Sequence, residues 1–280
     1  MNLEDSRILI TGAAGGIGAS LARRLAASRA KLFLTDVNSA GLERVADGLR
    51  RARADVIAVA ADVTKDEGRN ALTGRARAVG IDVLINVAGV NPFGLFTEQS
   101  PSEIERTLAI NTCAPMLLCQ ALIPVLAERK EAHIVNVGST FGAIGFPGFG
   151  IYSASKFAIR GFTEALRREL ADTSIRVHYV APRATRTALS TDRVRALNDE
   201  LKIAMDTPES VAHAIERALQ RGQRETYLGL AERISVVINA LLPWLVDNTI
   251  RRQLPVIRRH AARSDEPSQA QNSFPASLPT

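Results

Sequence analysis

The chain has 280 residues, of which 46% are apolar and 23% charged, and its formal net charge is +6. This composition is ordinary for a soluble globular protein, and the two cysteines exclude a disulfide framework and favour a reducing, cytoplasmic location. The basic residues form no dominant run, so nucleic acid is not an expected partner.

Strand and helix signals alternate from the first residues onward. Short apolar runs predict strands over Arg7–Thr11, Lys31–Asp36, Asp55–Ala60, Val83–Asn86, His133–Gly138, Ser174–Val180 and Glu225–Leu228. Apolar residues spaced by three or four predict helices over Gly16–Ser28, Ala40–Arg51, Lys65–Val79, Ser102–Arg129, Tyr152–Ala171 and Pro208–Arg221. Ser102 is the expected N-cap of its helix. Repeated βα units predict an α/β fold: a doubly wound, Rossmann-type parallel sheet of about seven strands with helices on both faces.

A glycine-rich loop joins the first strand to the first helix. It reads Thr11-Gly-Ala-Ala-Gly-Gly-Ile-Gly18, so Gly12, Gly16 and Gly18 fall where a tight turn meets a helix N-terminus. Glycines let the backbone approach a pyrophosphate, and the helix dipole favours its negative charge. The spacing is wider than the usual dinucleotide fingerprint, so a simple strand-to-helix turn is the alternative for the loop by itself.

An acidic residue closes the second strand. Asp36 can accept hydrogen bonds from the adenosine ribose hydroxyls of a dinucleotide, and its charge would repel a 2′-phosphate. We therefore expect NAD rather than NADP, with a turn or capping role as the alternative for Asp36. Asp62 and Asn86 follow the third and fourth strands, and Gly89 lies close behind, so these positions are expected beside the adenine and ribose, with an ordinary loop as the alternative for each.

Three residues near the fifth strand suggest proton transfer. Ser139 follows that strand, while Tyr152 and Lys156 are four apart on a helix and therefore share a face. A ketone that receives a hydride needs a proton at its oxygen. A lysine ammonium about 4 Å from the phenol would favour phenolate by about 4 kcal/mol at an effective dielectric of ~20, which would bring its pKa close to neutral. Ser139 can orient the substrate oxygen.

These motifs together resemble the short-chain dehydrogenase/reductase family over roughly residues 5–230. The similarity lies in TGAAGGIG, DVT at 62–64, NVAG at 86–89, NVGST and YSASK at 152–156. The resemblance implies that Asn111, Ser139, Tyr152 and Lys156 are catalytic, with Asn111 holding a water that links the lysine to solvent. It also implies that Thr187 lies near the nicotinamide, although Arg183 stands where the family usually has glycine. The expected cofactor-binding residues are Gly12, Gly16, Ile17, Gly18, Asp36, Asp62, Val63, Asn86, Ala88, Gly89, Tyr152, Lys156 and Thr187.

The expected function is hydride transfer between NAD and a secondary alcohol or ketone. Phe141, Phe146 and Phe149 precede Tyr152 and suggest a hydrophobic substrate, such as a lipid-like or steroid-like molecule or an acyl thioester; ordinary packing is the alternative. Two other functions are open: a non-catalytic nucleotide-binding or scaffold protein, and an epimerase or dehydratase of the same fold. No histidine spacing suggests a metal ligand set, so no metal is expected.

The chain divides into three expected parts. Residues 1–230 form the dinucleotide-binding catalytic domain, with a lid over 183–206, a connection too long to be an ordinary loop. Residues 231–262 form an amphipathic helical extension, and residues 263–280 a disordered tail. Because residues 234–260 combine apolar faces with arginines, peripheral membrane contact is one hypothesis, and docking on the chain's own domain or on another subunit is the alternative. The family resemblance implies a homodimer or homotetramer that uses the helices beginning near Ser102 and Tyr152.

Overall fold

A computed structural model of the chain describes residues 1–262, and its centre is one parallel sheet. The strands are β1 (Arg7–Thr11), β2 (Lys31–Asp36), β3 (Val56–Ala60), β4 (Val83–Asn86), β5 (Ala132–Val137), β6 (Ile175–Ala181) and β7 (Glu225–Tyr227). They lie in the order β3-β2-β1-β4-β5-β6-β7, with every neighbouring pair parallel. This arrangement confirms the predicted doubly wound sheet. The order reverses between β1 and β4, which is where such sheets bind ligands.

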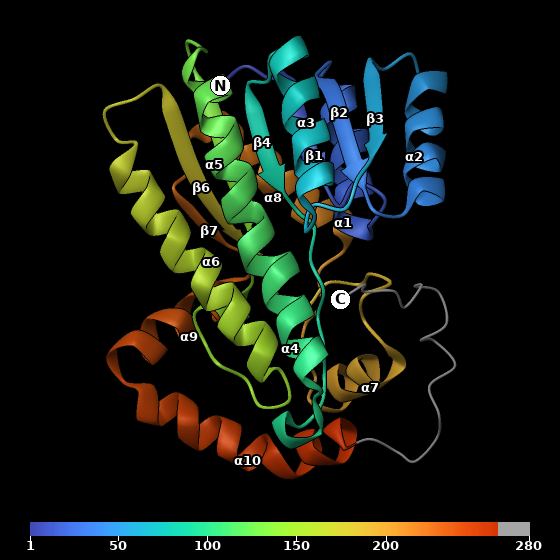
Figure 1. The fold of residues 1–280 in the computed structure, drawn as a ribbon. Helices are drawn as coiled ribbons and strands as arrows, with labels where there is room; N and C mark the ends of the chain where they lie inside the picture. The colour runs from blue at the N-terminus through green and yellow to red at the C-terminus, as the bar shows by residue number, and fades with distance from the viewer. Residues whose placement is uncertain (263–280) are drawn as a thin grey trace.

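Helices cover both faces of the sheet (Figure 1). One face carries α1 (Gly16–Ala27), α2 (Ser39–Arg51) and α8 (Pro208–Arg221), and the other carries α3 (Asp66–Val79), α5 (Ala114–Ala127) and α6 (Gly150–Glu169). Two apolar clusters fill the layers on either side. Adjacent β1 residues show the division, because Ile8 and Ile10 point into one cluster while Leu9 points into the other.

The long helix predicted over Ser102–Arg129 is divided in the structure. It consists of α4 (Pro101–Leu108), a π-helical turn η2 (Ala109–Cys113) and α5. Its N-cap is Ser100 rather than Ser102, because Ser100 and Glu103 form a capping box and Pro101 occupies the first turn. The run Pro101–Ala127 has the length and hydropathy of a membrane span, but its apolar side chains Leu118, Leu122 and Leu126 are buried in the core.

The parts that lie beyond the carboxyl ends of the strands come from the lid and the extension. The lid contains α7 (Asp192–Glu200), a helix that the sequence did not predict, and the extension consists of α9 (Leu230–Leu241) and α10 (Pro243–Ala261). In Figure 1 these three helices lie below the sheet, on the side to which the strand arrows point. The expected tail, 263–280, lies outside the described residues. Residues 1–262 also contain two 3₁₀ turns, η1 (Phe96–Glu98) and η3 (Thr140–Gly142).

Candidate active site

The glycine loop packs so closely that side chains would not fit. Gly12 has φ of +68°, and a Cβ on it would lie 2.8 Å from the Ala88 backbone. A Cβ on Gly18 would lie 2.1 Å from the carbonyl oxygen of Gly12. The helix behind the loop has Gly15 as its N-cap and therefore no capping side chain. The first N–H groups of this helix are thus available to an anionic group, which is the arrangement that a pyrophosphate requires.

Most of the residues predicted to bind the cofactor line one cavity of about 360 Å³ at this loop. They come from four different strand ends and from the lid: Gly12, Gly16, Ile17, Gly18, Asp36, Asp62, Val63, Ala88, Gly89 and Thr187. Sequence reasoning missed Arg106 and Ile110, which also line the cavity but carry no motif. The lining of this cavity therefore has the glycines and carboxylates that a nucleotide site requires.

Asp36 also holds the loops of the cavity together. Its Oδ2 accepts a hydrogen bond from the Ala14 N–H at 2.9 Å, and its Oδ1 accepts one from the Asn38 N–H at 2.9 Å. The carboxylate thus joins the end of β2 to the glycine loop, which is the turn role that the sequence left open. It still faces the cavity, where its remaining lone pairs can accept ribose hydroxyls.

Asn86 departs from the expectation. Its side chain does not line either cavity of the site but is buried in the core, where Nδ2 donates to Asn136 Oδ1 at 2.9 Å. The reason is the alternation of side chains along β4, which turns Asn86 to the same side as Leu84, into the layer between the sheet and α5. The following turn is instead fixed by Thr11, whose hydroxyl accepts hydrogen bonds from the N–H groups of Val87 and Ala88. Thr11 is the first residue of the glycine motif, but the spacing of that motif did not predict this role.

Ser139, Tyr152 and Lys156 line a second cavity, of about 210 Å³. It adjoins the cofactor cavity, since Ile17, Gly89 and Thr187 line both. The structure therefore brings together the three residues that the sequence predicted to act in proton transfer.

A buried tyrosine positions Ser139. The Tyr179 hydroxyl donates to the Ser139 carbonyl oxygen at 3.1 Å and accepts from the Ser139 N–H at 3.3 Å. The Ser139 hydroxyl in turn accepts the Phe141 N–H at 3.1 Å, which caps the short turn η3. A Cβ on Gly138 would lie 2.2 Å from the Tyr179 ring, so glycine is required there. Tyr179 lies 40 positions from Ser139 in the sequence, so no local motif predicts this contact.

Burial dominates the electrostatics of the Tyr152–Lys156 pair. Burial raises the pKa of Tyr152, and the Ser139 side chain lowers it in part. Burial also lowers the pKa of Lys156 to about 8. The Lys156 Nζ donates to the Val137 carbonyl oxygen at 3.0 Å and lies 5.7 Å from the centre of the Tyr152 ring. The sequence argument, in which the ammonium lowers the phenol pKa to near neutral, omitted the desolvation that acts on both groups.

Asn111 lies in the π-helical turn, a feature that often marks functional sites. Its Oδ1 accepts the Val90 N–H at 2.8 Å, and its Nδ2 donates to the Val90 carbonyl oxygen and to Ser155 Oγ. The side chain thus joins the loop after β4 to α6, one residue before Lys156. Its water-holding role stays a prediction.

The walls of the second cavity come from the lid, the aromatic loop and the extension. Phe141, Phe146 and Phe149 line it and also pack on one another, so the packing alternative is confirmed, while the hydrophobic substrate stays a prediction. Six residues of the lid also line this cavity: Leu189, Ser190, Val194, Leu197, Asn198 and Ile203. Glu232 of α9 and Asn91 also line the cavity, and sequence reasoning selected neither.

The contacts of Arg183 explain why an arginine stands where the family usually has glycine. Its Nε donates to Asp206 Oδ1 at 3.0 Å and its Nη1 to Glu232 Oε1 at 3.3 Å. One guanidinium thus joins both ends of the lid to α9. Another lid arginine, Arg193, donates to backbone carbonyls at the C-terminal end of α10, including that of His260 at 2.9 Å. These contacts give Arg183 and Arg193 a structural role, because they hold the lid to the extension.

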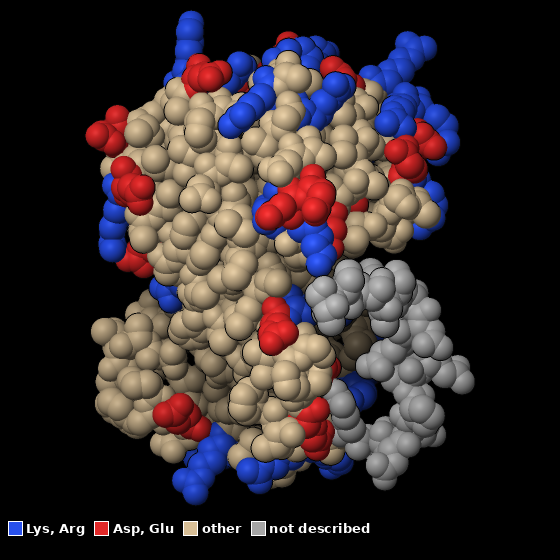
Figure 2. Space-filling view, viewed as in Figure 1, with Lys and Arg blue, Asp and Glu red and all other residues tan. Residues whose placement is uncertain are grey.

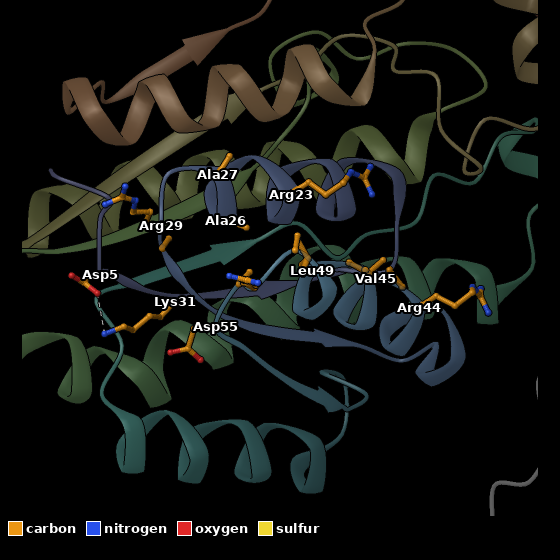
Figure 3. A pocket seen from close by; sticks show the side chains of 17 residues that line it. Asp5, Arg23, Ala26, Ala27, Arg29, Lys31, Arg44, Val45, Leu49 and Asp55 are labelled. Atoms are coloured by element: carbon orange, nitrogen blue, oxygen red, sulfur yellow. Dashed lines mark ion pairs between the residues drawn. The ribbon is translucent and has the colours of Figure 1, made fainter.

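The largest cavity described, about 800 Å³, lies elsewhere, between α1 and α2. Figure 3 shows that its basic side chains Arg23, Arg29 and Arg44 point in different directions rather than toward one centre. Lys31 is paired with Asp5 at 3.1 Å. This groove therefore has volume without a converging set of ligands. Within residues 1–262, no group of three or more His, Cys, Asp or Glu side chains is placed to hold a metal ion.

Comparison with known proteins agrees with the geometry. The family model described as short chain dehydrogenase matches residues 6–198. The ketoacyl reductase HetN of Nostoc sp. is 32% identical over 260 residues, which cover 89% of each chain. The 3-ketoacyl-(acyl-carrier-protein) reductase of Brucella melitensis, solved with NADH, has a TM-score of 0.73 at 30% identity, covering 81% of this chain and 97% of its own. A short-chain dehydrogenase of Sphingobium yanoikuyae, solved with NADPH, has a TM-score of 0.74 at 31% identity, covering 93% and 99%.

Proposed function

This chain belongs to the short-chain dehydrogenase/reductase family, and we propose that it interconverts ketones and secondary alcohols with NAD, using Tyr152 as its proton-transfer group. One observation carries the proposal: Ser139, Tyr152 and Lys156 line a cavity that shares Ile17, Gly89 and Thr187 with the cavity of the glycine loop. A substrate oxygen at the tyrosine is therefore adjacent to the place for a nicotinamide.

Each residue has a part that its contacts support. The bound dinucleotide supplies the hydride or accepts it. Tyr152 gives a proton to the carbonyl oxygen during reduction and takes one from the alcohol during oxidation. Ser139, held by Tyr179, donates a hydrogen bond that orients the substrate oxygen. Lys156 can exchange a proton beside the phenol near pH 8, the value to which burial lowers its pKa. Asn111 fixes the position of α6 through Ser155.

NAD is the proposed cofactor because Asp36 faces the cavity at the end of β2. A carboxylate there accepts ribose hydroxyls and repels a 2′-phosphate. We expect kcat/KM to favour NADH over NADPH at least about tenfold, which corresponds to about 1.4 kcal/mol. Asp36→Asn should reduce this preference, and Asp62→Asn, which removes a nearby charge, is the matched control. An unchanged preference in Asp36→Asn would remove the basis for proposing NAD.

The proposed substrate is predominantly apolar. Three phenylalanines and four aliphatic lid residues line the cavity, and the two charged residues in its lining, Glu232 and Arg183, are paired with each other. Lipid-like ketones, steroid-like ketones and acyl thioesters should be compared with short polar ketones by the consumption of NADH. The proposal predicts that kcat/KM rises with the apolar surface of the ketone. Equal or higher values for the short polar ketones would contradict it.

We further propose a cytoplasmic homo-oligomer. Both cysteines are free thiols, Cys119 buried and Cys113 exposed, which suits a reducing compartment. Leu117 on α5 and Phe157 on α6 are exposed apolar side chains on the helices expected to join subunits. Sedimentation of the wild type and of Leu117→Glu tests this: the wild type should be a dimer or tetramer and the variant smaller. A monomeric wild type would contradict it.

A further inference from the structure

The extension carries an apolar face that no part of the described chain covers. Seven large apolar side chains between residues 230 and 245 are 39–74% exposed, and α9 contains no buried residue. They are Leu230, Ile234, Val237, Leu241, Leu242, Trp244 and Leu245. The first four follow one another at spacings of four, three and four, so they share one face of α9. We define these seven residues as the apolar face.

The apolar face borders a basic one. Residues 230–262 contain five arginines against two acidic residues, an excess of three positive charges. Arg233, Arg251, Arg252 and Arg258 are exposed, and no ion pair within residues 1–262 engages them. Figure 2 shows almost uninterrupted uncharged surface over α9 at the lower left and basic side chains along the lower edge over α10. The single tryptophan of the chain, Trp244, lies at the turn where the two helices meet.

We propose that α9 and α10 dock the enzyme on the surface of an anionic membrane, with the apolar face in the headgroup boundary and the arginines against the lipid phosphates. Apolar residues, a tryptophan at the boundary and adjoining arginines are what an interfacial helix requires. A second copy of the chain fits less well, because a symmetric contact pairs the same surface from both subunits and would bring their two basic surfaces together.

Docking would bring the substrate cavity close to lipid. Glu232 lines that cavity, while Ile234, two positions along the same helix, is on the apolar face. The Asn239 amide also donates to the Ala143 carbonyl oxygen at 2.9 Å, which fixes α9 to the loop after η3. The cavity therefore lies within about one helix diameter, ~10 Å, of the proposed lipid contact. The proposal does not depend on the catalytic assignment, because vesicle binding is measured without turnover.

The test uses the full-length protein and vesicles of phosphatidylcholine, with and without about one third phosphatidylglycerol. We expect co-sedimentation with the anionic vesicles and a blue shift of Trp244 emission when they are added. Leu241→Ser with Leu245→Ser should weaken binding at least about tenfold while leaving the tryptophan as a probe. Arg251→Gln with Arg252→Gln should weaken it by about tenfold or more on anionic vesicles.

The matched control is Arg75→Gln with Arg77→Gln, which removes the same charge from the exposed side of α3. It should bind as the wild type does. An equal loss in this control, or no emission shift with either vesicle, would overturn the proposal. Sedimentation of the leucine variant without lipid tests whether a second copy of the chain covers the apolar face. A smaller assembly than that of the wild type would show that it does, and this result would also overturn the membrane proposal.

Discussion

Lys156 is buried at a cost to the fold that can be measured. The residue is only 6% exposed, and burial lowers the pKa of its ammonium group from 10.5 to about 8. A base whose pKa is lowered on folding binds protons more tightly in the unfolded chain. Stability is therefore reduced at low pH and recovers as the pH rises from 8 toward 10.5. At pH 7 the reduction is about 3 kcal/mol, from 1.36 kcal/mol for each pKa unit.

Replacing this lysine by methionine should therefore stabilise the protein at neutral pH. Lys156→Met removes the buried charge but also leaves the Val137 carbonyl oxygen without its hydrogen bond, at a cost of about 1 kcal/mol. The net expectation at pH 7 is a gain of about 2 kcal/mol in the free energy of unfolding, with turnover lost.

Urea unfolding without added dinucleotide, at pH 7 and pH 10, provides the assay. Between these values the advantage of the variant should shrink by about 2.5 kcal/mol, because the wild type then folds with a neutral lysine. Packing differences cancel in this comparison, since they do not depend on pH. Lys130→Met, at an exposed position, is the control and should show no such trend. A Lys156→Met advantage that stays constant from pH 7 to pH 10 would refute the reasoning.

Three further predictions concern the scaffold. His178 is 1% exposed and burial lowers its pKa from 6.5 to about 4, so about 3 kcal/mol of stability, present above pH 6.5, should be lost as the pH falls to 4. The urea midpoint of His178→Gln should not show this loss, and wild-type and variant midpoints that fall in parallel with pH would contradict the prediction. Tyr179→Phe removes both hydrogen bonds to the Ser139 backbone and should cost about 2 kcal/mol in urea unfolding and lower kcat more than it raises KM; an unchanged kcat would exclude the positioning role. Gly12→Ala should weaken dinucleotide binding at least about tenfold by calorimetry, since its Cβ would meet the Ala88 backbone, and wild-type affinity would disprove the close approach.

Local patterns were enough to predict much of the fold. Apolar runs and the turns between them located the strands, because a strand that is buried on both faces is a continuous apolar run, which can be recognised without knowing its neighbours in the sheet. The spacing of four between Tyr152 and Lys156 predicted their shared face for the same reason. The N-cap was wrongly placed at Ser102, although the capping box of Ser100 with Glu103 and the proline in the first turn are both local signals for a start at Ser100.

The remaining features depend on contacts between distant positions. Arg183 pairs with Asp206 and Glu232, which lie 23 and 49 positions away, and no spacing rule connects them. The orientation of Asn86 depends on which of the two core layers each side of β4 faces. The raised pKa of Tyr152 depends on burial by segments from several parts of the chain, so a pairwise estimate from Lys156 was incomplete.

Tyr152→Phe tests the central claim most directly, with turnover of a ketone that the wild type reduces and NADH affinity measured on the same preparation. The variant keeps the aromatic packing on Phe141 and Phe149 and loses only the hydroxyl. The account predicts that kcat falls by at least about 10² to 10⁴, the contribution of a positioned general acid, while the NADH Kd stays within about twofold. Turnover by Tyr152→Phe close to that of the wild type would contradict the assignment of this phenol as the proton-transfer group.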